Sequence, residues 1–311
     1  MNSIFVINGG AGRVLCSIPA LEKFQQNNPD DDFVIALEWW AELFENHPTL
    51  SDKVVDMNAE DCFEKYFIDR NPLQPEPYLD TDFYTCKKNL VQSFDKLINN
   101  TDDHSDVYSP SLFLSEFEQH NGMHLTNSIK KDLSKKKLVV FQPYGSTSQL
   151  IGGEIVDFSG RGIPTEKFLK ISKLLCSEAV VCYMGPPDFY LPNDVFSSNL
   201  FNINPTLRTY MSIINCCDAF IGCDSVGQHI ARSFEKPATV LMGTTIEKNV
   251  SYPDYEKFKF FRKPDFEPTY HPMRLGNGAA QKAERLNKGI MNFTDQECID
   301  IAHMVLEQID A

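Results

Sequence analysis

The sequence predicts an α/β protein built of two Rossmann-like domains that face each other across a cleft. Short apolar runs alternate with helix-like periodic stretches in both halves of the chain, and a lysine-rich segment at residues 134–137 separates the halves. Strands that alternate with helices form a parallel sheet with helices on its faces. The length of 311 residues fits two domains, whose ligands bind at the carboxyl ends of the strands.

In the first half, three apolar runs are typical of strands, and several periodic stretches are typical of helices. The expected strands are residues 4–7, 33–37 and 54–57, and the expected helices are residues 14–24, 39–44, 86–98 and 112–120. A glycine loop at residues 9–12 follows the first strand. We assign residues 1–136 to the N-terminal domain, because the charged segment ends there and a strong strand begins.

The second half repeats the alternation and defines a C-terminal domain at residues 137–293. Its expected strands are residues 138–141, 179–184, 219–222 and 238–242, and its expected helices are residues 165–177, 207–216 and 226–234. A last helix is expected at residues 294–308. Thr294 and Glu297 have the spacing of a capping box at its start.

The composition indicates a globular protein with no overall attraction to nucleic acid. The formal net charge is −14, and an acidic chain is not drawn to phosphate backbones by its overall field. No run approaches the ~18 apolar residues of a membrane span, and the N-terminus lacks the features of a signal peptide. The odd number of nine cysteines, mostly in apolar runs, indicates buried thiols. We expect a cytoplasmic location.

A metal site is not expected. Cys217, Cys223 and His229 have the spacing Cys-x5-Cys-x5-His, without the paired cysteines of a zinc knuckle. Two of these residues also fall in or beside a predicted buried strand, so a packing role is favoured.

Two loops that follow predicted strands could approach an anionic ligand. The glycine loop lets the backbone come close to a ligand, but Leu15 stands where a dinucleotide fingerprint requires its third glycine. A tight packing turn is the alternative. The second loop, residues 143–148, offers the hydroxyls of Ser146 and Thr147 at the end of a strand. The alternative is a merely polar loop.

A third segment, residues 217–245, carries the strongest signal. A strand ends in Asp224 and Ser225, either of which can cap the next helix, and the amides of Val226 and Gly227 then point at whatever lies above that helix. A diphosphate is the natural ligand of such a site. In the alternative interpretation these residues only cap the helix, and His229 is an interior histidine.

This third segment resembles the C-terminal signature of the heptosyltransferase-like glycosyltransferases of family 9. There, a strand ending in Asp-Ser/Thr-Gly precedes a His, an apolar helix, Gly-Lys-Pro and a strand that closes in Gly-Pro-Thr. The corresponding residues here are Asp224, Ser225, His229, residues 235–237 and residues 243–245. Other segments are also similar to the family: the first turn and helix at residues 12–21, the second strand at 33–38, the Asn-Pro loop at 46–50, the donor loop at 142–146 and the closing helix at 292–306.

The resemblance implies a GT-B fold with an acceptor-side N-terminal domain, a donor-binding C-terminal domain, and a final helix, residues 294–311, that packs back toward the N-terminal domain. It implies inverting, metal-independent transfer of a sugar from a nucleotide-diphosphate sugar to a hydroxyl, with no further cofactor. The residues expected at the donor are Gly12, Ser146, Thr147, Met184, Gly185, Asp224, Ser225, Val226, Gly227, His229 and Lys248.

The chain departs from the family pattern at the expected base. The family has an Asp directly after the first glycine turn, and this chain has Arg13, which cannot act as a base near neutral pH. Glu38, Asp82 or Asp80 are the other candidates for the base, and Arg13 could instead pair with a donor phosphate or an anionic acceptor. The Lys that follows the family's donor loop is also missing, and Arg161 or Lys248 is its expected substitute.

The acceptor is left open by the sequence and could be a soluble glycan, a protein or a modified DNA base. Transfer to hydroxymethylated DNA bases, as in phage enzymes, is an alternative function, supported by lysine clusters at residues 87–88, 130–131 and 135–137. Solvated helix ends are the other interpretation of these lysines. A second alternative is a catalytically inactive GT-B protein that binds a nucleotide sugar, because Arg13 replaces the base.

Overall fold

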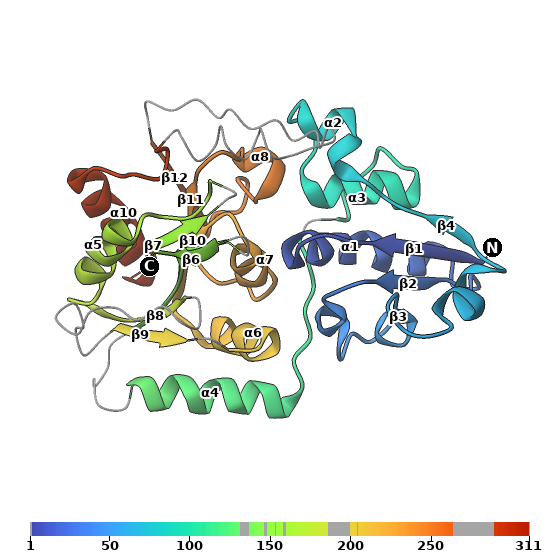
Figure 1. Ribbon diagram of the computed structural model, residues 1–311, viewed down its shortest axis with the longest axis horizontal. Helices are drawn as coiled ribbons and strands as arrows, with labels where there is room; N and C mark the ends of the chain where they lie inside the picture. Colours follow the sequence, from blue (N-terminus) through green and yellow to red (C-terminus); the bar gives the residue numbers. More distant parts are fainter. Residues whose placement is uncertain are drawn as a thin grey trace. The chain divides into compact units, whose positions relative to one another are not determined.

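The computed structural model describes residues 2–107, 109–130, 137–145, 148–152, 154–157, 160–185, 200–203, 205–263 and 289–310. The chain divides into two compact units, Met1–Ser115 and Glu116–Ala311, which we call unit 1 and unit 2 (Figure 1). Each unit has its own parallel sheet, so the predicted pair of Rossmann-like domains is confirmed.

Unit 1 contains a four-stranded sheet in the order β3-β2-β1-β4. Its strands are β1 (Ser3–Ile7), β2 (Val34–Leu37), β3 (Val54–Asp56) and β4 (Asn71–Leu73). The chain adds β2 and β3 on one side of β1 and then returns to pair β4 with its other side. The carboxyl ends of β1 and β4 are therefore the switch point of this sheet, the place where α/β proteins bind ligands. Sequence patterns miss β4, since it contains Pro72 and is only three residues long.

Two helices of unit 1 pack against each other, α1 (Ala11–Asn27) and α3 (Leu90–Asn99). α3 starts with a capping box between Asn89 and Gln92. The π-helical turn Phe63–Phe67 packs against a separate small apolar cluster that is formed by residues of β1 and β2. The helix predicted at residues 39–44 is only a 3-10 turn at Ala41–Phe44, and a short helix, α2 (Thr81–Tyr84), precedes α3.

Unit 2 contains a six-stranded parallel sheet in the order β12-β11-β10-β5-β8-β9. The four predicted strands are present as β5 (Lys137–Gln142), β8 (Ala179–Met184), β10 (Ala219–Cys223) and β11 (Ala238–Met242), and β9 (Leu200–Ile203) and β12 (Phe258–Arg262) extend the two edges. The strand order reverses between β5 and β10. The switch point of this sheet thus lies at the carboxyl ends of β5 and β10, where Gln142 is the last residue of β5 and Asp224 directly follows β10.

The helices of unit 2 cover both faces of its sheet. α5 (Thr165–Leu175) and α10 (Asp295–Asp310) pack side by side and share one apolar core with the strands. α6 (Leu207–Cys216) and α7 (Val226–Ser233) pack on the other face, and the short helix α8 (Glu247–Val250) follows β11. The buried face of α10 contacts α5, β10 and β11, so this helix belongs to the core of unit 2.

The boundary between the units lies about twenty residues before the predicted one at 136–137. α4 (Glu116–Lys130) packs on α6, where Gly122 lies so close that a Cβ would be 2.7 Å from the carbonyl oxygen of Ser212. The guanidinium of Arg208 also donates twice to the carboxylate of Glu118, at 2.6 Å each. α4 is therefore the first element of unit 2, although the lysine-rich segment after it suggested a domain boundary.

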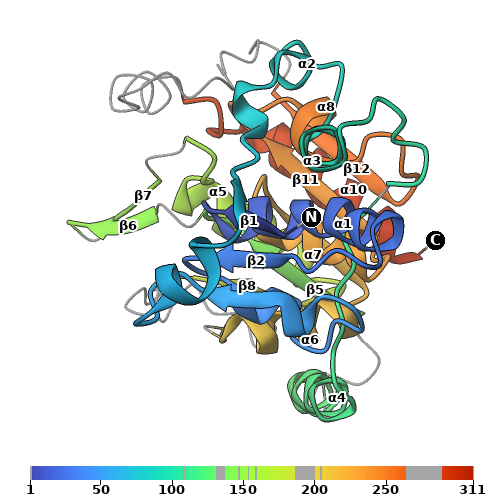
Figure 2. The ribbon, with the colours of Figure 1, turned by 90° about the vertical axis from the view of Figure 1, so that its right-hand side faces the viewer.

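An antiparallel hairpin that no sequence pattern predicted lies between β5 and α5. Its strands are β6 (Ser148–Ile151) and β7 (Glu154–Asp157), and it extends away from the six-stranded sheet (Figure 2). Among the residues that the structure describes, no helix is both long and apolar enough to span a membrane.

Candidate functional site

The end of β5 is joined to the start of α7 by the side chain of Gln142. Its Nε2 donates to the hydroxyl of Ser225 at 3.0 Å, and its Oε1 accepts from the amide of Gly227 at 3.0 Å. The same two atoms bond the carbonyl oxygen of Tyr144 at 3.3 Å and the hydroxyl of Tyr210 at 3.1 Å. Because Gln142 is buried, these four hydrogen bonds fix the loop after β10 at the switch point of the sheet.

Asp224 is a buried carboxylate that holds an arginine at this switch point. Its Oδ1 accepts from Nε2 of Gln228 at 2.5 Å. Nη1 of Arg161 donates to the main-chain oxygen of Asp224 at 2.7 Å and lies 3.8 Å from Oδ2. Burial raises the pKa of Asp224, and the charge of Arg161 opposes this rise. Since the Arg161 side chain is still 25% exposed and a guanidinium carries five N–H donors, it can reach an anionic ligand as well.

The first residues of α7 are arranged differently from the prediction. Ser225 makes no capping hydrogen bond, and its hydroxyl accepts from Gln142. The amide of Gly227 points at Gln142, so the prediction that it faces a ligand is wrong. A Cβ at Gly227 would lie 2.4 Å from Gln142 Oε1, so this glycine allows close packing of helix and sheet. The amide of Val226 is at the first helical position, where no intrahelical acceptor exists.

His229 lies in the interior of unit 2. Its Nδ1 is 2.8 Å from the hydroxyl of Tyr252, and the two rings meet edge to face. Burial and, to a smaller extent, the nearby charge of Arg161 lower the pKa of His229 to about 3, so the imidazole is neutral at physiological pH. The alternative interpretation, an interior histidine, accounts for these contacts, and the donor site proposed below does not include His229.

The end of β11 is shaped by a second arginine. Arg262 donates to the carbonyl oxygens of Gly243 at 2.9 Å and Thr245 at 2.5 Å, and to the carboxylate of Glu247 at 3.0 Å. This turn carries Lys248 at the start of α8, where its side chain is exposed and makes no ion pair with a residue that the structure describes.

A pocket of about 230 Å³ lies beside this end of the sheet. Gly243 contacts its wall, because a Cβ there would meet the carbonyl oxygen of Gly160 at 2.9 Å and the sulfur of Met291 at 3.1 Å. The pocket is mostly apolar, with the carboxylate of one aspartate. Its lining residues are Tyr144, Ile155, Val156, Asp157, Gly160, Gly162, Ile163, Pro164, Gly289, Ile290, Met291 and Asn292. Of these residues only Tyr144 belongs to a loop that the sequence singled out, residues 143–148, since a pocket between a hairpin and a loop distant in sequence leaves no local pattern.

The other predicted donor residues are scattered along the chain. Met184 is half-buried and Gly185 buried at the end of β8, and Gly12 is in the first turn of α1 in unit 1. Ser146 and Thr147 lie outside the described residues. Among the side chains that the structure does describe, no group of three His, Cys, Asp or Glu residues could hold a metal ion.

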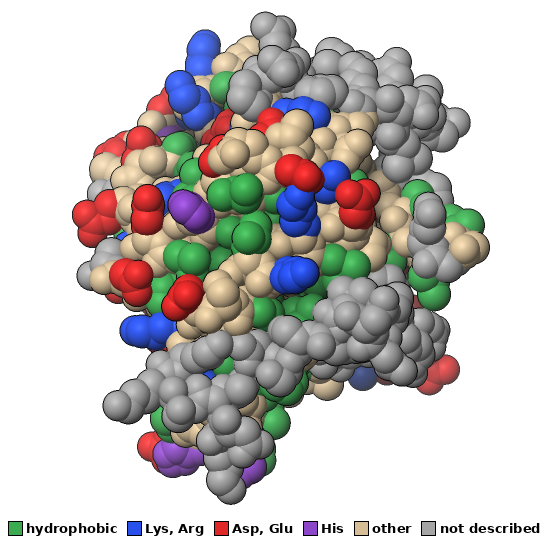
Figure 3. All heavy atoms as spheres, turned by 90° about the vertical axis from the view of Figure 1, so that its left-hand side faces the viewer, with side chains coloured by type: hydrophobic (Ala, Val, Ile, Leu, Met, Phe, Trp, Pro, Cys, Tyr) green, Lys and Arg blue, Asp and Glu red, His purple; other side chains and the backbone are tan. Residues whose placement is uncertain are grey.

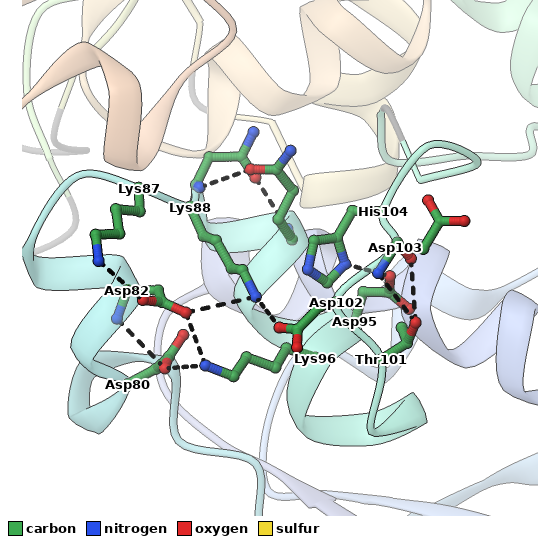
Figure 4. Close-up of polar contacts among 12 residues, drawn as sticks. Asp80, Asp82, Lys87, Lys88, Asp95, Lys96, Thr101, Asp102, Asp103 and His104 are labelled. Atoms are coloured by element: carbon green, nitrogen blue, oxygen red, sulfur yellow. Dashed lines mark hydrogen bonds and ion pairs between the residues drawn. The ribbon is translucent and has the colours of Figure 1, made fainter.

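The predicted base candidates of unit 1 have very different surroundings. Glu38 is exposed at the end of β2. Asp82 accepts from Nζ of Lys96 at 2.8 Å, and the amines of Lys88 and Lys87 lie 3.5 Å and 3.9 Å away (Figure 4). The hydrogen bond from Lys96 lowers the pKa of Asp82. Arg13 is buried and paired with a carboxylate that the sequence analysis did not single out, Glu76.

Aspartates pair with those lysines of the three clusters that the structure describes, whereas residues 131, 135 and 136 lie outside the described residues. Lys88 also pairs with Asp102 at 2.8 Å, and Lys130 and Lys137 both pair with Asp218 in unit 2. On the coloured part of the face in Figure 3, Lys and Arg side chains are interspersed with Asp and Glu. Within the described part of the chain, neither arrangement forms the continuous basic surface that binding to a DNA backbone requires.

No protein-family model matches the sequence, and no curated protein matches it. Solved structures do match over almost the whole chain. They include the ADP-heptose lipopolysaccharide heptosyltransferase II of E. coli, with 14% identity and a TM-score of 0.65 over 99% of this chain and 100% of that one. A family 9 glycosyl transferase of Veillonella parvula has 12% identity and a TM-score of 0.68 over 98% and 97%.

A third match is TibC of enterotoxigenic E. coli, a dodecameric iron-containing heptosyltransferase solved with ADP-D-β-D-heptose. It has 12% identity and a TM-score of 0.63, over 99% of this chain and 77% of that one. At these identities the likeness concerns the fold. The chain therefore has the GT-B fold of the heptosyltransferases, as the sequence resemblance implied.

Proposed function

We propose that the protein is a glycosyltransferase that moves a sugar from a nucleotide-diphosphate sugar to an acceptor hydroxyl. One observation carries the proposal: the Asp224-Ser225 signature of the resemblance falls at the switch point of the unit 2 sheet, beside the partly exposed side chain of Arg161. Ligands of α/β sheets bind at such a point. The heptosyltransferase fold of the whole chain supports the same function.

In this proposal unit 2 binds the donor through its diphosphate. Arg161 and the amide of Val226 stabilise the negative charge that grows on the leaving nucleoside diphosphate, and Asp224 fixes the guanidinium in position. Lys248, which lies in α8 just after β11, is a second cationic side chain available to the diphosphate. Since two of the similar structures are named for ADP-heptose, an ADP-sugar is the first donor to test.

The reaction that we propose inverts the configuration at the anomeric carbon. It needs no metal ion, because cationic side chains supply the charge that a divalent ion provides in other transferases. The stereochemistry is checked by NMR of the anomeric proton of the product. The metal requirement is checked by the rate in EDTA and after addition of divalent ions. Retention of configuration, or a rate that depends on an added ion, would contradict these two points.

The donor site is tested by calorimetric titration with ADP. Arg161→Ala removes charge-assisted hydrogen bonds worth about 1.5–3 kcal/mol, so we expect the Kd for ADP to rise about 10–100-fold. Arg161→Lys should restore part of the affinity. Lys173→Ala removes an exposed lysine of α5 and serves as the matched control. Equal affinities in all four proteins would remove Arg161 from the site, and no binding of ADP, UDP or GDP by the wild type would refute the proposed function.

A further inference from the structure

Arg13 occupies the position at which a base is expected, and its side chain is fixed inside unit 1. Nη1 donates to Oε2 of Glu76 at 3.1 Å, and Nη2 donates to the carbonyl oxygen of Pro75 at 3.1 Å. The guanidinium lies 5.2 Å from the ring centre of Tyr78 and 5.8 Å from that of Phe94. Only 3% of the side chain is exposed, so Arg13 is not available to bind a ligand directly.

Glu76 is held in one orientation and still reaches solvent. Its Oε1 accepts from the amide of Tyr78 at 3.3 Å, while Oε2 is bound by Arg13. Pro75 and Pro77 on either side restrict the backbone around it. The side chain is 27% exposed. Each carboxylate oxygen has more than one acceptor site, so both can accept a further hydrogen bond.

The place of this pair in the sheet is independent evidence for a role at a ligand. Arg13 follows β1 and Glu76 follows β4. These are the two strands between which the order of the unit 1 sheet reverses. Glu76 therefore brings a carboxylate to the switch point from the neighbouring strand, on the side of the sheet where the glycine loop also lies.

The other carboxylates considered from the sequence are less suited to accept a proton. Asp82 lies within 4 Å of three lysine amines, and Lys96 also pairs with Asp80 at 3.1 Å. Glu38 follows β2, one strand away from the switch point. Among the described residues Glu76 has one cationic partner, Arg13, and that partner is fixed in place.

We propose that Glu76 is the general base of the reaction and that Arg13 is its positioning residue; this rests on the proposed function. Glu76 takes the proton of the acceptor hydroxyl as the acceptor oxygen attacks the anomeric carbon of the donor sugar. The bond between that carbon and the diphosphate oxygen breaks, and the nucleoside diphosphate leaves with the electron pair. The Glu76 carboxylic acid then releases its proton to solvent.

The test measures ADP release from ADP-heptose, with water as the acceptor. Glu76→Gln keeps the size of the side chain and removes its basicity, so we expect the rate to fall about 10²–10⁴-fold with the Kd for ADP unchanged. Glu76→Asp should keep part of the rate. Glu60→Gln, at an exposed position of unit 1, is the matched control and should behave as the wild type.

Two further measurements separate a base from a structural residue. Sodium formate, a small carboxylate, should restore part of the rate in Glu76→Ala and have no effect on the wild type. In Arg13→Gln the kcat should fall while the KM for ADP-heptose and the Kd for ADP stay unchanged, because the Glu76 carboxylate is no longer held in one orientation. If that variant does not fold, as judged by its thermal transition, Arg13→Lys replaces it, with a smaller expected loss of kcat.

The outcomes distinguish this inference from the function on which it rests. An unchanged rate in Glu76→Gln, with normal ADP binding, would overturn the assignment of the base and leave the transferase function standing. The same holds if the rate is lost in Glu38→Gln or Asp82→Asn instead. A wild-type protein that neither binds ADP nor releases it from ADP-heptose would overturn both.

Discussion

Replacement of Gln142 by Leu tests the hydrogen-bond network at the switch point of unit 2. Leucine has nearly the size of glutamine but neither donates nor accepts, so the buried amide of Gly227 and the hydroxyl of Tyr210 both lose the acceptor that they have in the structure. An orphaned buried polar group costs about 1–3 kcal/mol. At ~1.5 kcal/mol for each donor, the free energy of unfolding of unit 2 should fall by about 3 kcal/mol.

This loss is measurable by heat and by chemical denaturation. For a unit of this size, ~3 kcal/mol corresponds to a Tm lowered by roughly 6–12 °C. Gln149→Leu, at an exposed position of β6, should change the stability by less than about 0.5 kcal/mol. Affinity for ADP should also fall in Gln142→Leu, because Ser225 loses its donor. A Gln142→Leu protein as stable as Gln149→Leu would show that the four hydrogen bonds do not stabilise the site as argued.

Other variants and conditions test the same structure. Gly227→Ala forces a methyl group to within 2.4 Å of a side-chain oxygen and should cost about 1–3 kcal/mol in a denaturant titration, whereas Gly10→Ala, with open space around it, should cost less. The pKa of His229 is lowered to about 3 in the folded protein, whereas in the unfolded chain it has the ordinary histidine pKa of ~6.5. Between pH ~6.5 and 3 only the unfolded chain therefore takes up this proton, so the free energy of unfolding should fall as the pH drops, by up to ~1.4 kcal/mol per pH unit. His229→Gln should flatten this slope. In a thiol titration of the native protein, only the partly exposed Cys86 and Cys216 should react rapidly, and the other seven cysteines should react only after denaturation; fast reaction of more than two thiols would contradict the burial described.

Much of the fold could be predicted from local pattern. The strands β1, β2, β5, β8, β10 and β11 are apolar runs bounded by glycine or polar residues, and the capping box of the last helix forms as its spacing predicts, with Thr294 and Glu297 bonded to each other's amides. Apart from the hairpin of β6 and β7, the strands missed lie at the edges of the two parallel sheets: β4 contains a proline, and β9 and β12 pair on one side only. For edge strands, pairing with a neighbour decides the structure more than local composition does.

The position of the candidate site in the sheet was predictable where a polar residue follows a strand directly, as for Asp224 and Ser225. It was not predictable where a partner comes from elsewhere in the chain. Gln142 is 85 residues away from the amide of Gly227, and Arg13 is 63 residues away from Glu76. Arg13 and Glu76 come into contact only because the sheet pairs β1 with β4. The long-range contact with Gln142 also explains the glycine at position 227, because a Cβ there would lie 2.4 Å from Oε1 of Gln142.

The attachment of α4 to α6 has a practical consequence for dividing the chain. A fragment that starts at the lysine-rich segment would expose the strip of α6 against which Gly122 packs, and would leave Asp218 without Lys130. A fragment that starts at Glu116 keeps both contacts. Unit 2 is therefore best expressed with its leading helix included, and the shorter piece should aggregate or melt at a lower temperature.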